Sequence, residues 1–164
     1  MTKSMGKIII SNQQVDELRS IISGEVLTDH LSLIAYSTDA SVYSEEPAAV
    51  VVPAHVEDIV KMVEFASKNK IPLIPRAGGT SLAGQVVGSG VVVDVSKNLT
   101  QIIELNTDEK WVRVQPGVIL DELNRYLKPH GLLFGPETST ANRCTLGGMV
   151  GNNRSEEHTS ELQS

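Results

Sequence analysis

The sequence has 164 residues, a formal net charge of -6 and 40% hydrophobic residues. This length suits one domain with a hydrophobic core, and the acidic charge differs from the basic charge of nucleic-acid-binding domains. No segment has the roughly 20 consecutive apolar residues of a transmembrane helix, and the amino-terminal apolar run at 8–10 is too short for a signal peptide. We therefore expect a cytoplasmic protein with no transmembrane segment and no nucleic-acid partner.

The amino-terminal third predicts one helix and one strand. Val15, Leu18 and Ile22 recur at helical spacing, which predicts a helix over 12–22 that ends before Gly24. A polar connector at 36–47 then leads into the β-rich run "AAVVVP", which predicts a buried strand that Pro53 closes.

The segment 54–70 predicts the clearest helix of the chain. Its apolar side chains form one expected buried stripe, and two carboxylates in its first turn favour the helix dipole. The stripe consists of Val56, Ile59, Val60, Val63 and Ala66, and the carboxylates are Glu57 and Asp58. The run "IPLIP" follows as a second buried strand, so the three elements form a βαβ unit whose crossover should be right-handed if its strands are parallel.

The second half predicts strands before it returns to helix. "GVVVDV" predicts a third strand at 91–95 and "WVRVQP" a fourth at 111–114, with a meander between them. Helical spacing through Ile119, Leu123, Tyr126 and Leu127 then predicts a helix that stops at Pro129 and Gly131, and Thr145 is placed to open a further helix.

The segment "PRAGGTSLAGQ" follows the second strand and combines glycines with hydroxyl side chains. Successive main-chain N–H groups in such a turn can bind an anion, with Arg76 as a charge partner, and a diphosphate would fit. The segment lacks the lysine of a Walker loop, and "GQVVGSG" lacks the Rossmann glycine spacing. From spacing alone, a plain tight turn remains the alternative.

Four motifs in order and spacing carry a family resemblance: "PRAGGTSLAGQ", "VQPGV", "LKPHGLLFGPETST" and "CTLGGMVGNN". They resemble the FAD-binding domain of the vanillyl-alcohol oxidase and p-cresol methylhydroxylase superfamily, and within it the FAD-linked D-lactate, glycolate and D-2-hydroxyglutarate dehydrogenases. The resemblance implies an α+β fold of the p-cresol methylhydroxylase type, with FAD between two subdomains. The first would contain the parallel βαβ unit, and the second would be incomplete.

The resemblance also implies the cofactor-binding residues, and each is carried over from a matching motif position. The first loop would hold the FAD diphosphate, the second would lie near the flavin, and the last motif would line the rest of the cofactor. A solvated carboxylate remains the alternative for Glu137. The residues are Arg76, Ala77, Gly78, Gly79, Thr80, Ser81 and Gln85, then Pro136, Glu137, Thr138 and Ser139, then Thr145, Gly147, Gly148 and Asn152.

Three positions bear on how FAD is held. Relatives usually have glycine at the position of Ala77, which would carry a strain of about 1–2 kcal/mol if that site needs a positive φ. Relatives with histidyl-linked flavin carry histidine near Thr80, so we expect noncovalent FAD here. Cys144 is the only cysteine; we expect a buried thiol, with a covalent flavin link as the alternative.

The resemblance implies oxidation of a small-molecule 2-hydroxy acid to a 2-keto acid by the full-length protein. The catalytic base would lie in a carboxyl-terminal substrate domain beyond this chain, so no catalytic residue is assigned and the chain alone should be inactive. An iron-sulfur domain or subunit would accept electrons and could hold the protein at the inner membrane face. The alternatives are a stand-alone FAD-binding module and a flavin reductase of the enolpyruvyl reductase type.

Residues 154–164, "RSEEHTSELQS", lack apolar periodicity and correspond codon by codon to a translated sequencing adapter. We expect them to be a non-native tail. The expected organisation is therefore an amino-terminal helix and connector at 1–47, a truncated FAD-binding domain at 48–153, and the tail at 154–164.

Overall fold

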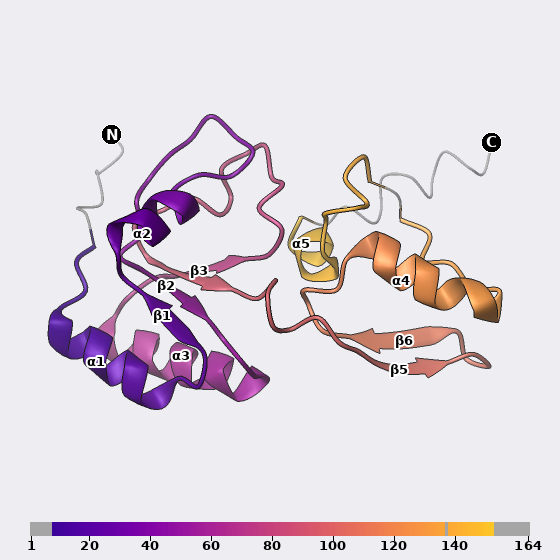
Figure 1. Cartoon of the computed structure of the whole chain (residues 1–164), viewed down its shortest axis with the longest axis horizontal. Helices are drawn as coiled ribbons and strands as arrows, with labels where there is room; N and C mark the ends of the chain where they lie inside the picture. The colour runs from indigo at the N-terminus through magenta and orange to yellow at the C-terminus, as the bar shows by residue number, and fades with distance from the viewer. Residues whose placement is uncertain (1–7, 137, 153–164) are drawn as a thin grey trace. The chain divides into compact units, whose positions relative to one another are not determined.

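A computed structural model of the chain describes residues 8–136 and 138–152. The chain forms two compact units (Figure 1). The first unit contains the chain up to Arg76 together with Ser81–Asp94, and the second contains Ala77–Thr80 together with the chain from Val95 onward. The chain therefore passes between the units three times, after Arg76, after Thr80 and after Asp94.

A four-stranded mixed sheet forms the centre of the first unit, in the order β1-β2-β4-β3. β2, β4 and β3 are parallel, as expected for a βαβ unit, and β1 is antiparallel to β2. All residues of β2 and β4 are buried, which explains their continuous valine runs. The strands are β1 (Glu25–Leu27), β2 (Ala49–Val52), β3 (Leu73–Arg76) and β4 (Val91–Asp94).

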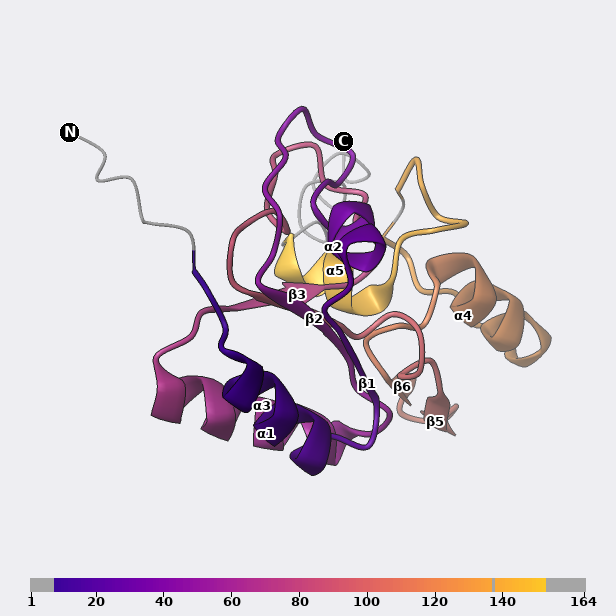
Figure 2. The same ribbon diagram turned by 60° about the vertical axis from the view of Figure 1, so that its left-hand side comes forward.

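Helices cover both faces of this sheet. α1 (Asn12–Ile21) and α3 (Val56–Asn69) lie on one side, and α2 (His30–Tyr36) lies on the other, as Figures 1 and 2 both show. Leu33 and Tyr36 of α2 pack on a core of Val50, Val52 and Val92. Ser11 caps α1 through a reciprocal pair of hydrogen bonds with Gln14, so the predicted helix begins at its expected residue.

The predicted helix α3 is confirmed, but the stripe expected to be buried is largely wrong. Met62, Phe65 and Ala66 form its buried apolar face, whereas Val56, Val60 and Val63 are each about half exposed. The buried face of α3 is rotated from the expected one because Asp58 lies inside the unit. Its side chain is 1% exposed and accepts hydrogen bonds from the main-chain N–H groups of residues 23, 24 and 54. This contact turns the Asp58 face of the helix toward the body of the unit.

β3 also differs from expectation, because it is an edge strand and not a buried one. Among the described residues its only sheet neighbour is β4, and Pro75 is exposed. An edge position tolerates proline, since one side of the strand makes no ladder hydrogen bonds.

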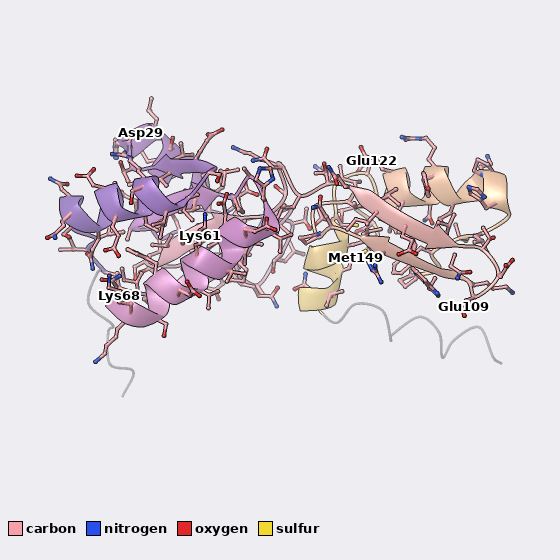
Figure 3. All side chains as sticks on the ribbon, turned by 90° about the horizontal axis from the view of Figure 1, so that it is seen from below. Asp29, Lys61, Lys68, Glu109, Glu122 and Met149 are labelled. Atoms are coloured by element: carbon pink, nitrogen blue, oxygen red, sulfur yellow. The ribbon has the colours of Figure 1, made fainter. Side chains whose placement is uncertain are left out.

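The described part of the second unit consists of a hairpin and three helical segments. Its core joins Leu120, Leu123 and Leu127 of α4 to Leu146 and Met149 of α5, and Figure 3 labels Met149 on α5. The strand at 102–106 lies in the segment expected to be a meander. The elements are β5 (Ile102–Asn106), β6 (Trp111–Val114), α4 (Leu120–Leu127), a 3₁₀ helix (Lys128–His130) and α5 (Leu146–Gly151).

The expected ends of this helical region are confirmed in detail. Gly131 ends the 3₁₀ helix with a φ of 68°, in the left-handed region that glycine favours. Thr145 is the N-cap of α5, as its position predicted. Glu109, labelled in Figure 3, accepts a 2.7 Å hydrogen bond from the indole N–H of Trp111 at the β5–β6 turn.

Candidate functional site

The loop at 77–80 presents main-chain donors that have no acceptor in the described part of the chain. Gly79 has a left-handed φ of 62°. The N–H groups of Gly78, Gly79 and Thr80 have no acceptor within residues 8–136 and 138–152. Successive free N–H groups around a left-handed residue form an anion-binding nest. Gly78 is exposed, so this nest is not packed inside the fold.

The loop lies beside the second glycine-rich segment of the same unit. A methyl group on Gly78 would lie 2.8 Å from the carbonyl oxygen of Arg143, which is too close for a side chain. A methyl group on Gly148 would lie 3.6 Å from Cβ of Ala77, which is an ordinary contact. The structure therefore brings together two motifs that are some 65 residues apart in the sequence, as expected for two loops that hold one extended ligand.

Ala77 carries no backbone strain. The non-glycine residues with positive φ in the described part of the chain are Lys70 and Lys110. The site therefore does not need a left-handed residue at position 77, and the strain that a relative's glycine would have avoided does not arise.

The last motif is built for close packing around α5. The N–H groups of Leu146 and Gly147 donate to the carbonyl oxygens of Val118 and Pro116, at 2.9 Å each. A methyl group on Gly147 would lie 2.7 Å from Cβ of Pro116, so only glycine fits there. The "VQPGV" motif is thus joined to "CTLGG" by direct contact.

Gly148 and Asn152 have internal partners in the same helix. The N–H of Gly148 approaches the Thr145 hydroxyl at 3.4 Å, and the N–H of Asn152 donates to the Gly148 carbonyl at 3.0 Å. The main chain of this segment is therefore largely occupied, in contrast with the free donors of residues 78–80.

Three expected site residues belong to the first unit. The Arg76 guanidinium donates a 2.7 Å hydrogen bond to the carbonyl oxygen of Thr38 and lies over the ring of Tyr36. The Ser81 hydroxyl is buried and donates to the side-chain oxygen of Gln85 at 2.7 Å. These polar groups are already paired within the protein.

The segment expected to lie near the flavin is described only in part. Glu137 lies outside the described residues, while Pro136 and Thr138 are half-buried and Ser139 is exposed. The Thr138 hydroxyl lies 3.1 Å from the Cys144 sulfur, and Cys144 is 6% exposed. Cys144 is therefore a buried thiol with a polar neighbour, the first of the two readings of this cysteine.

Two features of the structure had no counterpart in the sequence reasoning. The Thr140 hydroxyl oxygen is buried without a hydrogen-bond partner among the described residues. The carbonyl oxygen of Thr140 accepts hydrogen bonds from the N–H groups of Arg143 and Cys144 in a turn. Tyr36 and Asp94 are joined by a 2.6 Å hydrogen bond at the ends of α2 and β4. The run of hydroxyl residues around Thr140 is a sequence signal for the first feature. No local sequence pattern predicts the pairing of Tyr36 with Asp94.

Comparison with known proteins decides the family. A family model described as "FAD binding domain" matches residues 47–162. The chain belongs to this family. The domain is 46% identical over 130 residues to the D-2-hydroxyglutarate dehydrogenase of Haemophilus influenzae. The aligned residues cover 77% of this chain and 13% of that relative. It is 32% identical over 122 residues to the glycolate oxidase subunit GlcD of Bacillus subtilis, which covers 73% of this chain and 26% of the relative.

The fold of this FAD binding domain has a counterpart among solved structures. A crystal structure of p-cresol methylhydroxylase with substrate bound superposes with a TM-score of 0.66 at 21% identity, over 87% of this chain and 28% of that one. The α+β fold of the p-cresol methylhydroxylase type, expected from the four motifs, is confirmed. The domain spans only a small part of the relatives it matches, and no described helix is long and apolar enough to cross a membrane.

Proposed function

We propose that this chain is the FAD-holding part of a flavoenzyme that oxidises a 2-hydroxy acid to a 2-keto acid. The observation that carries the proposal is the row of three N–H groups at residues 78–80, which have no acceptor among the described residues. The names of the relatives, D-2-hydroxyglutarate dehydrogenase and glycolate oxidase subunit, support the hydroxy-acid class of substrate.

The loop suits a diphosphate for physical reasons. Gly78 and Gly79 have no side chains, so phosphate oxygens can approach the main chain closely. The left-handed φ of Gly79 turns neighbouring N–H groups toward a common side, and such donors bind anions without a metal ion. These residues therefore fit the diphosphate of FAD.

Bound FAD would supply the hydride acceptor, and the protein would supply binding and orientation. In this proposal the donors of the first loop hold the diphosphate, and the later segments line the remaining cofactor. FAD is held noncovalently, because residue 80 is a threonine, which cannot form the histidyl bond to flavin, and the Cys144 thiol is buried. The proposed cofactor residues are Arg76, Ala77, Gly78, Gly79, Thr80, Ser81, Gln85, Pro136, Glu137, Thr138, Ser139, Thr145, Gly147, Gly148 and Asn152.

The remaining parts of the reaction belong to the whole protein. The catalytic base and the cations that bind the substrate carboxylate would lie in a substrate domain outside this chain. An iron-sulfur domain or subunit would receive the electrons in the cytoplasm or at the inner membrane face. On this proposal the chain binds FAD but turns over no hydroxy acid.

A pair of glycine variants tests the proposal. Gly79→Ala and Gly131→Ala both place alanine at a left-handed position, with φ values of 62° and 68°, and each should cost about 1–2 kcal/mol of backbone strain. A methyl group on Gly131 meets no atom within 4 Å, which makes Gly131→Ala a control for strain alone. FAD affinity is measured by titration with flavin fluorescence.

We expect Gly79→Ala to weaken FAD binding by about tenfold or more, since 1.4 kcal/mol of loop distortion corresponds to a factor of ten. Gly131→Ala should bind FAD like the unmodified chain while its melting temperature falls. Equal FAD affinity in both variants would refute the proposed role of the loop.

A further inference from the structure

Tyr36 links the ends of three elements in the first unit. Its hydroxyl donates a 2.6 Å hydrogen bond to Oδ2 of Asp94, the last residue of β4. The guanidinium carbon of Arg76, the last residue of β3, lies 5.2 Å from the centroid of the Tyr36 ring. Tyr36 is itself the last residue of α2. One side chain therefore contacts the carboxyl ends of two parallel strands.

These strand ends are the points where the chain leaves the first unit. Arg76 precedes the segment Ala77–Thr80, and Asp94 precedes Val95; both following segments belong to the second unit. Arg76 and Asp94 are also paired directly across the β3–β4 ladder. The N–H groups of residues 78–80 therefore follow Arg76 along the chain by two to four residues.

The contacts of this cluster hold the Arg76 side chain within the first unit. Asp94 is 4% exposed, and a hydrogen bond from a hydroxyl to a buried carboxylate is among the stronger kinds. The Arg76 guanidinium lies over the ring of Tyr36 and donates to the carbonyl oxygens of Thr38 at 2.7 Å and of Tyr36 at 3.4 Å. A planar guanidinium suits both contacts, whereas a lysine ammonium would suit neither geometry as well.

We propose that Tyr36 is a positioning residue for the diphosphate loop, acting through Asp94 and Arg76. We call the contacts among Tyr36, Asp94 and Arg76 the clamp. In the clamp, the Arg76 side chain supports the loop through its position more than through its charge. The inference rests on the proposed function of the loop and adds residues that lie outside all four glycine motifs.

Tyr36→Phe is the central variant, because it keeps the ring beneath Arg76 and on the sheet while it removes the donor to Asp94. Tyr43→Phe is the matched control: it makes the same chemical change in the same unit, and Tyr43 is 59% exposed. Three quantities are measured on the full 164-residue chain: FAD affinity, the melting temperature without FAD, and the ¹⁵N heteronuclear NOE of the amides of residues 78–80 without FAD.

We expect Tyr36→Phe to weaken FAD binding about five- to twentyfold and to lower the heteronuclear NOE at residues 78–80, while Tyr43→Phe changes neither. A purely structural role would lower the melting temperature of Tyr36→Phe and leave the NOE values and the FAD affinity unchanged, which would overturn the inference. Failure of the unmodified chain to bind FAD would refute the proposed function, and the NOE values would still decide whether Tyr36 positions the loop.

Arg76→Lys separates position from charge. The variant keeps the positive charge but loses the planar group over Tyr36. We expect it to weaken FAD binding as much as Tyr36→Phe, and we expect the double variant to be little weaker than either single one. Wild-type affinity in Arg76→Lys would contradict the clamp and would favour a simple charge role.

Discussion

At the scale of single residues, Asp58 shows how one carboxylate organises the first unit. Its two oxygens accept hydrogen bonds from the N–H groups of Ser23, Gly24 and Ala54, at 2.9–3.1 Å. Burial alone would raise the pKa of Asp58, but these main-chain hydrogen bonds outweigh it and hold the pKa below its usual value. The residue therefore ties the turn before β1 to the start of α3 as an anion.

We expect Asp58→Asn to lower the free energy of unfolding at pH 7 by about 2–4 kcal/mol, because an amide cannot accept all three bonds and brings donors toward other donors. Because the folded pKa lies below the unfolded value of about 3.9, the charged form stabilises the fold above that pH, and the contribution is lost as pH falls through the folded pKa. Urea unfolding at pH 7 and at about pH 3 measures both effects.

Glu57→Gln is the control for Asp58, since Glu57 is exposed in the same helical turn. It should change stability by less than about 1 kcal/mol through the helix dipole. A loss in Glu57→Gln as large as that in Asp58→Asn would contradict the role assigned to the buried hydrogen bonds.

Cys144 offers a second test at this scale. Its sulfur is buried and lies 3.1 Å from the Thr138 hydroxyl, so we expect no covalent bond to flavin. Acid precipitation of the FAD-loaded chain should release all the yellow colour into the supernatant. Colour that stays with the pellet, and that is lost in Cys144→Ser, would contradict this expectation.

At the scale of elements, α3 ends on a residue that strains its backbone. Lys70 is the C-cap of the helix, with a φ of 56°, and its N–H donates to the carbonyl oxygens of Ala66 and Ser67. Glycine adopts this conformation without the steric cost that other residues carry.

We therefore expect Lys70→Gly to be more stable than Lys70→Ala by about 1 kcal/mol, the left-handed strain less the extra flexibility that glycine gives the unfolded chain. Both variants lose the same charge, so their difference isolates the backbone. Thermal unfolding measures it, and equal melting temperatures would show that the helix end relaxes around alanine without strain.

The elements that sequence reasoning found share a strong local signal. The valine runs of β2 and β4 predict buried strands, and the spacing in α1 predicts its buried residues Val15 and Leu18. β1 has three residues, too few for a periodic pattern. α2 packs Leu33 and Tyr36 on the sheet but exposes Leu31 and Ile34, so its apolar residues do not form a single stripe. Both elements owe their place to packing on the sheet.

In the site too, features with a local sequence signal were predictable, and features that depend on contacts between distant residues were not. The glycine loop and the α5 cap are local patterns, and the residues alone indicated an anion at the first and a helix start at the second. The expected α3 stripe is wrong because Asp58, which the sequence indicated only as a favourable charge for the helix dipole, is held inside by a turn some 35 residues earlier. The pairing of Tyr36 with Asp94 joins residues 58 positions apart and could only come from the folded chain.

At the scale of the whole molecule, the charge of the chain bears on how it binds an anion. The net charge is -6, and FAD is itself anionic at neutral pH. An acidic protein cannot attract FAD through its overall field, so the affinity must come from short-range donors. Main-chain N–H groups supply such donors, and salt weakens them much less than it weakens pairs of exposed charges.

We accordingly expect FAD affinity to change by no more than about threefold between 0.05 and 0.5 M NaCl, and any change to be toward tighter binding, because salt screens the repulsion. Titrations across this range measure it. A steep loss of affinity with salt would indicate that exposed lysine or arginine side chains hold the diphosphate.

The most direct test of the central claim follows the amide signals of the chain by NMR during titration with FAD. The account predicts that the amide resonances of Gly78, Gly79 and Thr80 move downfield together as their N–H groups receive phosphate oxygens, while those of Gly24 and Gly131 stay in place. Saturating FAD that shifts other amides and leaves these three unchanged would contradict it.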